Sequence, residues 1–274
     1  MTLAVLGAAL AHATWNAMVK SSSDVLLDTT SVIAGAGVAA LPLVFFLEPP
    51  APASWPYLVA SVVIHIGYYI ALVGAYSAGD LSHGYPIMRG VAPLIVALSA
   101  ALWLREAPTP AIWAGVLLIS GGVLSLGLAG FHWRESRVST GWALLNAGII
   151  ASYTLVDAAG VRVSGSPAGY VLWIFLLDAL PFPILVYMVK KKALLDYARK
   201  YWLRGLVGGV LSAGAYGVAL WAMTRAPVAA VAALRETSVV FAALIGAYFL
   251  REGHVGRRLG GAAIVAMGVI ALKL

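Results

Sequence analysis

Ionisable side chains inside long apolar stretches are the residues of this sequence best placed to do chemistry. They are His12, His65, Arg89, Asp157, Asp178, Arg235 and Glu236. In a membrane-spanning helix such a group costs about 2.5 to 3.5 kcal/mol, so it usually has a ligand or a polar partner. The histidines and acids lack the spacing of metal ligands, and H-E-x-x-H, G-x-S-x-G and P-loop motifs are absent. We therefore expect binding of a small ligand, with no metal, no cofactor and no enzymatic activity.

Arg89 and Arg235 are the most informative pair, because they occupy equivalent positions in an internal repeat. Two planar guanidinium groups would bind a substrate carboxylate or phosphate in bidentate fashion. The alternative is structural: an ion pair such as Arg89 with Asp178, or extension of Arg235 to the membrane surface. Glu236 and Asp178 would bind a substrate ammonium group or carry a coupling proton, or else pair with the arginines.

The residues around Arg89 predict an interrupted helix. They read Tyr85-Pro86-Ile87-Met88-Arg89-Gly90-Val91-Ala92-Pro93, and the two prolines and the glycine weaken backbone hydrogen bonding. Interrupted helices commonly mark binding sites in transporters. Tyr85 is therefore expected in the wall of a pocket, and so are Tyr68 and Tyr69, which lie deep in an apolar stretch.

His12, Trp15 and Asn16 lie close together on the first apolar stretch, with His12 and Asn16 on one helix face. His12 would contact substrate or relay a proton, although a histidine in an apolar helix is more often hydrogen-bonded packing, which is also our interpretation of His65. The repeat places Tyr153 opposite Trp15, and aromatics at matching places suit a cavity wall. The predicted binding residues are Arg89, Arg235, Glu236, His12, Trp15, Asn16, Tyr85, Tyr153, Asp178 and Tyr69.

The composition of the chain places these residues in a membrane protein. Of its 274 residues, 62% are hydrophobic and 11% are charged, and the mean hydropathy is +0.92. A soluble domain carries about 25% charged residues. The apolar stretches match a bilayer core, which needs about 20 residues per helix. Their length and their Ala, Leu, Gly and Val content favour helices over barrel strands.

Ten membrane-spanning helices account for the apolar stretches. They are predicted over residues 2–19, 28–47, 56–78, 84–104, 110–129, 139–158, 168–189, 202–223, 228–250 and 256–273. Prolines lie at or near several of the helix starts, where a missing N–H costs nothing. The connectors are short, so they leave no room for a soluble catalytic domain.

An internal repeat divides the chain into two halves. With a shift of 146 residues, Arg89 aligns with Arg235, Leu104-Arg105-Glu106 with Leu250-Arg251-Glu252, Gly115 with Gly261 and Gly122 with Gly268. The predicted units are therefore 1–136 and 137–274, with five helices each, in one integral membrane domain. An odd number of spans per half forces the halves into opposite orientations. Such inverted repeats are typical of secondary transporters, whose site lies at the repeat interface.

These features together resemble the drug/metabolite transporter superfamily. The resemblance rests on the five-plus-five spans, on His12-Ala13-Thr14-Trp15-Asn16 followed by Lys20, and on Leu-Arg-Glu closing the fourth and ninth spans. Within the superfamily the whole chain resembles the EamA-type exporters, a group that includes exporters of aromatic amino acids. Arg105 and Arg251 stand where these proteins often carry Gly. The resemblance implies ten helices around a central cavity.

The expected function is export of small metabolites, above all amino acids, aromatic ones included, by alternating access at a central cavity. A zwitterion needs groups of both charge signs, and both signs are present at depth. One alternative is a transporter of anionic sugar phosphates or nucleotide sugars, and another is a membrane-embedded enzyme or assembly subunit.

The expected partners are a small-molecule substrate and membrane lipid. The net charge is +7, but the basic residues lie in short connectors instead of a stripe interleaved with aromatics, so no nucleic acid is expected. We expect a multi-pass protein of the cell inner membrane, monomeric or weakly homo-oligomeric.

Two arguments about orientation conflict. The connectors on the side of residues 190–201 hold 12 basic residues, and those on the other side hold 4. The positive-inside rule then puts the first side in the cytoplasm and both termini outside. The resemblance instead implies cytoplasmic termini. We favour the charge bias, because it is a property of this chain.

Overall fold

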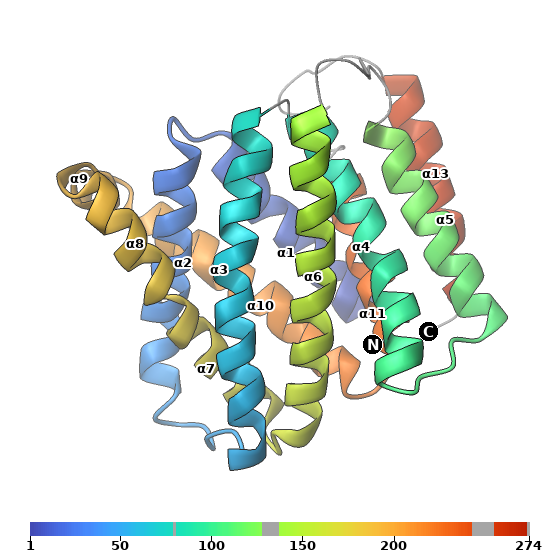
Figure 1. Ribbon diagram of the computed structural model, residues 1–274, viewed down its shortest axis with the longest axis horizontal. Helices are drawn as coiled ribbons and strands as arrows, with labels where there is room; N and C mark the ends of the chain where they lie inside the picture. The colour runs from blue at the N-terminus through green and yellow to red at the C-terminus, as the bar shows by residue number, and fades with distance from the viewer. Residues whose placement is uncertain (79–80, 128–136, 243–254, 273–274) are drawn as a thin grey trace.

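The computed structural model describes residues 1–78, 81–127, 137–242 and 255–272, which form a bundle of helices running side by side (Figure 1). No strand occurs among these residues. The elements are α1 (Thr2–Lys20), α2 (Val25–Leu43), the 3₁₀ turn η1 (Pro52–Ser54), α3 (Trp55–Ala78), α4 (Leu81–Trp103), α5 (Pro110–Gly127), α6 (Arg137–Val163), α7 (Pro167–Asp178), α8 (Pro181–Lys190), α9 (Lys192–Lys200), α10 (Trp202–Met223), α11 (Val228–Arg235) and α13 (Val255–Leu272).

Seven helical segments within the described residues are long and apolar enough to cross a membrane. They correspond to α1, α2, α3 with η1, α4, α6, α7 with α8, and α10. Two shorter apolar helices, Pro110–Leu126 and Gly260–Leu272, belong to α5 and α13. The chain is therefore an all-helical, multi-pass membrane protein, as its composition predicts.

The seventh predicted span, 168–189, is two helices instead of one. α7 ends at Asp178 and α8 begins at Pro181. Pro181 has no N–H for the helix ladder, so the helix is interrupted here although Leu180 keeps helical backbone angles. This break leaves Asp178 buried at the C-terminal end of α7.

The interrupted helix expected around Arg89 lies instead in the ninth predicted span. α4 is continuous from Leu81 to Trp103, with Pro86 and Pro93 inside it. Packing against α5, α6 and α11 stabilises this helix despite the missing N–H groups. α11 ends at Arg235, Glu236 forms a turn, and residues 237–242 are helical again. Arg235 and Glu236 therefore lie at a break between two helical segments.

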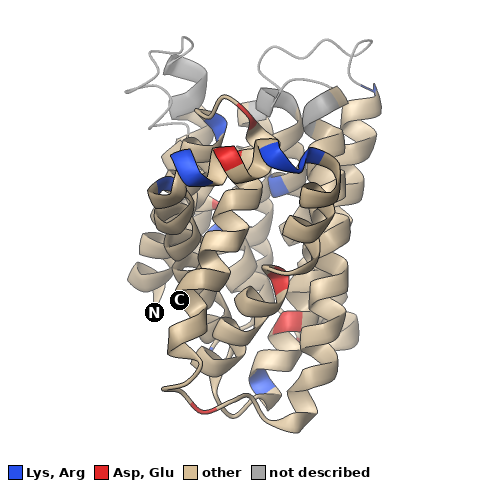
Figure 2. Ribbon diagram, turned by 90° about the vertical axis from the view of Figure 1, so that its left-hand side faces the viewer, with Lys and Arg blue, Asp and Glu red and all other residues tan. Residues whose placement is uncertain are grey.

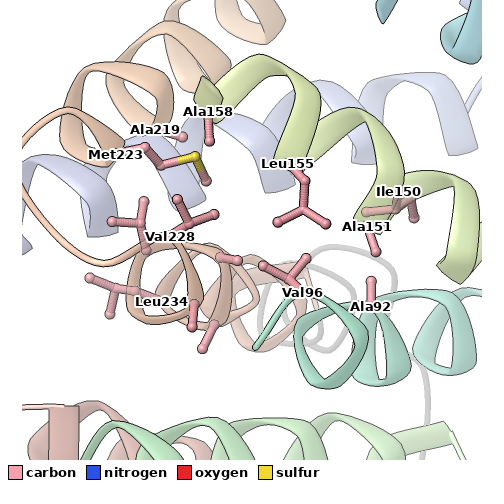
Figure 3. Packing of buried hydrophobic residues seen from close by; sticks show 14 of the residues in the cluster. Ala92, Val96, Ile150, Ala151, Leu155, Ala158, Ala219, Met223, Val228 and Leu234 are labelled. Atoms are coloured by element: carbon pink, nitrogen blue, oxygen red, sulfur yellow. The ribbon is translucent and has the colours of Figure 1, made fainter. Parts of the chain in front are cut away.

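α11 lies in the interior of the bundle. All eight of its residues are buried, and it contacts α1, α4, α5, α6 and α10. Figure 3 shows Val228 and Leu234 of α11 in one apolar cluster with Val96 of α4, Leu155 of α6 and Met223 of α10. Four of the eight residues are alanines, which allow neighbouring helices to approach closely. This packing holds the break that follows α11 inside the protein.

Glycines bring two helix pairs into close contact. A Cβ at Gly35 of α2 would lie 2.3 Å from the carbonyl oxygen of Gly205 on α10. On α5, a Cβ at Gly115 would lie 3.0 Å from the Gly268 carbonyl oxygen of α13, and a Cβ at Gly122 would lie 2.9 Å from that of Gly261. Such close approach gives van der Waals contact between helices in lipid, where no hydrophobic force drives them together. The glycines that align in the internal repeat thus lie at a close contact between α5 and α13.

A charged cluster joins several elements at one end of the bundle. Glu106, which follows α4, accepts a hydrogen bond of 2.8 Å from the N–H of Val228 at the start of α11. Its other carboxylate oxygen lies 2.5 Å from Nη2 of Arg162, near the end of α6. Arg162 also donates to the carbonyl oxygens of Met223 and Ala226. The cluster therefore connects the α4–α5 connector to α6, α10 and α11.

A second cluster joins α1, α2, α9 and α10. Asp28 is fully buried and accepts hydrogen bonds from Nε of Arg204 at 3.2 Å and from the Tyr197 hydroxyl at 3.0 Å. Arg204 also donates to the Met18 carbonyl oxygen and to Ser21. Burial and the hydrogen bond to Asp28 raise the pKa of Tyr197 to about 12, so its hydroxyl remains a donor at neutral pH.

Basic residues gather at one end of the bundle. Figure 2 shows most of the described Lys and Arg residues at its upper end. The residues around α9 contribute exposed Lys190, Lys191, Lys192, Arg199 and Lys200. Long basic side chains at a helix end reach lipid headgroups and water, which fits a membrane surface at this end.

Candidate binding cavity

A cavity lies between α1, α2, α3, α6, α7, α10 and α11. Its lining residues are His12, Trp15, Thr29, Val32, Ile33, Ala36, His65, Tyr68, Tyr69, Tyr153, Ile174, Phe175, Asp178, Ser212, Tyr216 and Arg235. Its volume of about 70 Å³ is smaller than the roughly 150 Å³ that holds benzene in an engineered apolar core. A metabolite therefore fits only when the surrounding helices or side chains move apart.

Part of the predicted binding set lines this cavity: His12, Trp15, Tyr69, Tyr153, Asp178 and Arg235. Arg89, Glu236, Asn16 and Tyr85 are not among its lining residues. The Asn16 amide donates to the His12 carbonyl oxygen at 2.8 Å, so it bonds within α1. The Tyr85 hydroxyl is buried and has no hydrogen-bond partner in the described part of the chain.

Arg235 presents its guanidinium group to the cavity from the break after α11. Its Cζ lies 5.0 Å from the ring centroid of Tyr216, a cation–π contact. No salt bridge between described residues includes Arg235. A planar, permanently charged group without an anionic partner is suited to bind a carboxylate or phosphate.

Arg89 is paired with Glu236. Nε of Arg89 lies 2.7 Å from Oε2 of Glu236, without the angular geometry of a hydrogen bond, and Nη2 lies 3.4 Å from the Ser238 hydroxyl. Both side chains are 5% exposed. The suggested pair of Arg89 with Asp178 is therefore wrong, because contact between α4 and α11 brings Arg89 to the break where Glu236 lies. The two repeat-related arginines thus have different environments.

Asp178 and His65 form an acid–imidazole pair in the cavity wall. Oδ2 of Asp178 lies 3.3 Å from Nδ1 of His65, and the Ser61 hydroxyl lies 3.2 Å from the same nitrogen. Oδ1 of Asp178 is buried and has no hydrogen-bond partner among the described residues. A buried oxygen of this kind usually has a donor, and a ligand ammonium group would supply one.

Aromatic rings surround His65. Tyr153 stacks on the imidazole with centroids 4.4 Å apart, and Tyr68 and Tyr216 meet it edge to face at 6.3 and 6.4 Å. On α1, the Trp15 indole N–H donates to Nδ1 of His12 at 3.3 Å. Stacked and edge-on rings of this kind are suited to an aromatic ligand. His65, expected only as packing, thus lies in the wall itself.

The sequence did not indicate the place of Tyr216 and Asp157. The Tyr216 hydroxyl donates to Oδ2 of Asp157 at 2.5 Å, and the Tyr170 hydroxyl donates to Oδ1 at 3.0 Å. Asp157 is fully buried and lies behind Tyr216, one side chain from the cavity. The sequence shows an acid and tyrosines deep in apolar stretches, and each of these side chains needs a polar partner there. That requirement could have indicated a contact between them.

Comparison with known proteins gives a family and a fold. The sequence profile of the EamA-like transporter family matches residues 139–274. A solved crystal structure of another protein is similar over the full length, with a TM-score of 0.81 and 20% sequence identity, covering 100% of this chain and 98% of that chain. At this identity the structural match shows the fold alone. No curated protein sequence matches the chain.

Proposed function

Because the chain belongs to the EamA-like transporter family, whose members are membrane transporters of small metabolites, we propose that it exports amino acids across the cell inner membrane. One observation carries the substrate class. The same cavity holds Arg235, which has no acidic partner among the described residues, and Asp178, whose Oδ1 has no donor there. A zwitterion supplies one group for each.

The substrate carboxylate would accept two parallel N–H bonds from Arg235, and the ammonium group would donate to Oδ1 of Asp178. Aromatic side chains are favoured, because Tyr68, Tyr69 and Tyr153 form a wall of rings in the same cavity. Binding would therefore combine two charge-assisted contacts with stacking.

Sugar phosphates and nucleotide sugars suit this cavity less well. Glu236 compensates the charge of Arg89, so Arg235 is the cavity arginine left to bind an anion. Arg235 is the one Arg or Lys among the described lining residues, so the second charge of a phosphate dianion would have no fixed cation there to balance it.

Alternating access between two inverted halves, 1–136 and 137–274, is part of this proposal. The helix contacts support it. In the order of the two halves, α1 corresponds to α6, α3 to α10 and α4 to α11. The contact of α3 with α6 therefore has its counterpart in the contact of α10 with α1, and the contact of α4 with α6 has its counterpart in the contact of α11 with α1. The glycine contacts between α5 and α13 behave in the same way. Gly115 aligns with Gly261 in the repeat, and Gly122 aligns with Gly268. The contact of Gly115 with Gly268 therefore has its counterpart in the contact of Gly122 with Gly261, and both contacts are present. Both observations favour ten helices related by a two-fold axis near α5 and α13.

Counterflow in proteoliposomes tests the substrate class. Vesicles preloaded with phenylalanine should take up labelled phenylalanine, and excess unlabelled amino acid should compete. Phenethylamine lacks the carboxylate and phenylpropionate lacks the ammonium group, so each should compete at least roughly tenfold more weakly, since a hydrogen bond to a charged group contributes about 1.5–3 kcal/mol.

Permeabilising the vesicles should abolish the signal, which separates transport from an enzymatic reaction. Stronger competition by a sugar phosphate than by amino acids would contradict the proposal and favour the anionic substrate class. Absence of counterflow for every amino acid tried would also reject it.

A further inference from the structure

The carboxyl group of Asp157 on α6 is held by tyrosines from two other helices. Tyr216 of α10 donates to its Oδ2 at 2.5 Å, and Tyr170 of α7 donates to its Oδ1 at 3.0 Å. Asp157 is fully buried, and no salt bridge between described residues includes it. An acid inside a membrane-spanning helix is costly, so its role is sought in the contacts that it makes.

The surroundings leave space for this arrangement and restrict the rings. Gly160 lies one turn after the acid on α6, and a Cβ there would overlap the hydroxyl of Tyr170. The ring of Tyr216 lies edge to face with those of Phe175 and Tyr153, with centroids 6.1 and 6.0 Å apart. The hydroxyl of Tyr216 therefore points away from the cavity toward the acid, while its ring borders the cavity.

The ring of Tyr216 carries the effect of Asp157 to the cavity. Cζ of Arg235 lies 5.0 Å from the ring centroid, and no salt bridge between described residues orients this guanidinium group. A long arginine side chain has many rotamers, and its planar fork binds a carboxylate in bidentate fashion only in the right orientation. A ring held in place by a buried acid supplies such an orientation.

We propose that Asp157 is a positioning residue for substrate recognition. It fixes the ring of Tyr216, and the ring orients the guanidinium group of Arg235 toward the substrate carboxylate. Asp157 does not line the cavity, so it acts through Tyr216 without touching the substrate. The inference rests on the proposed amino-acid substrate. It makes the affinity for ligands with a carboxylate depend on Asp157, and the affinity for ligands without one independent of it.

Binding of three ligands to the purified full-length protein tests this selectivity. Phenylalanine carries both charged groups, phenylpropionate has only the carboxylate for Arg235, and phenethylamine has only the ammonium group for Asp178. Isothermal titration calorimetry gives the Kd of each ligand. General damage to the cavity weakens all three, whereas a misoriented Arg235 weakens only the two carboxylates.

Tyr216→Phe removes the hydroxyl and keeps both the ring and the net charge. We expect phenylalanine and phenylpropionate to bind roughly tenfold more weakly, because a desolvated cation–π contact contributes on this order. The Kd of phenethylamine should stay within about twofold of the wild type. Tyr170→Phe is the matched control: it removes a donor from the same carboxyl group but does not contact Arg235, so all three affinities should remain.

A double-mutant cycle assigns the effect to Asp157. In an Asp157→Ala background the Tyr216 hydroxyl has no acceptor left to lose, so Tyr216→Phe should change the Kd of phenylpropionate by less than about twofold. Both proteins of this comparison lack the Asp157 charge, so its direct electrostatic effect on an anion cancels. A full roughly tenfold loss in this background as well would overturn the role of Asp157.

Equal weakening of all three ligands by Tyr216→Phe, or the carboxylate-selective loss in Tyr170→Phe, would show a merely structural role and overturn the inference. Wild-type protein that binds phenylpropionate but not phenylalanine would reject the amino-acid substrate, and phenylpropionate would still test the positioning.

If the wild type binds none of the three ligands, the proposed substrate fails, and the rate at which phenylglyoxal modifies Arg235, followed by mass spectrometry, replaces binding. Faster modification in Tyr216→Phe but not in Tyr170→Phe supports the positioning role, and equal rates in both variants reject it.

Discussion

Arg89 and Arg235 align in the internal repeat, yet Glu236 pairs with the first, whereas the second lies against Tyr216 in the cavity. Replacing one member of a buried ion pair leaves the other charge uncompensated, at a cost of about 3–5 kcal/mol. Replacing Arg235 leaves no such orphan among the described residues. The two arginines should therefore respond differently to the same substitution.

We expect Arg89→Ala to lower the melting temperature of the purified protein strongly, and Arg235→Ala to abolish counterflow with little change in melting temperature. Arg235→Lys should also impair counterflow, because a point charge does not reproduce the planar fork. Arg89→Met combined with Glu236→Leu is the control, since removing both partners recovers much of the stability. Equal losses of stability in both alanine variants would contradict this assignment.

At this scale the sequence predicts residue types better than residue partners. The internal repeat singles out both arginines, and the rule that buried charges need partners names the acids. Which acid meets which arginine depends on helix rotation and on the break at Glu236. No proline or glycine marks that break, whereas the residues around Arg89 contain both and form a continuous helix.

At the scale of helices and connectors, Glu106 anchors the connector that follows α4. Its carboxylate accepts a hydrogen bond from the first N–H of α11 and forms a salt bridge with Arg162. Glu106→Ala should lower the free energy of unfolding by about 1–3 kcal/mol, because it leaves the first N–H of α11 without its acceptor and Arg162 without its carboxylate partner. Thermal unfolding in detergent measures this. Glu48→Ala, on an exposed connector, should change stability by no more than about 0.5 kcal/mol. Similar melting temperatures for the two variants would show that the cluster does not stabilise this end.

The helices themselves follow closely from the apolar pattern, since α1, α3, α5 and α10 begin and end within two residues of the predicted bounds. The amphipathic α9 was expected only as a polar connector, because its nine residues are too few to cross a membrane. Its Leu194 packs with α2 and α8 residues, and Tyr197 bonds Asp28. These contacts, which no local pattern in the sequence reveals, turn the connector into a helix.

For the whole molecule, the unequal distribution of charge predicts an orientation in the membrane. The basic residues around α9 lie at one end of the bundle, and the α2–α3 connector that holds Glu48 lies at the opposite end (Figures 1 and 2). Basic connectors are retained in the cytoplasm during insertion. The positive-inside bias therefore predicts a cytoplasmic α9 and an external Glu48, whereas cytoplasmic termini require the reverse.

Single cysteines at Asp196 and Glu48 test this orientation, because both positions are exposed and the chain has no native cysteine. In intact cells an impermeant maleimide should label Glu48→Cys and leave Asp196→Cys unlabelled. Both should react after permeabilisation, which controls for accessibility of the thiols. Labelling of Asp196→Cys from outside, with Glu48→Cys protected, would reverse the orientation.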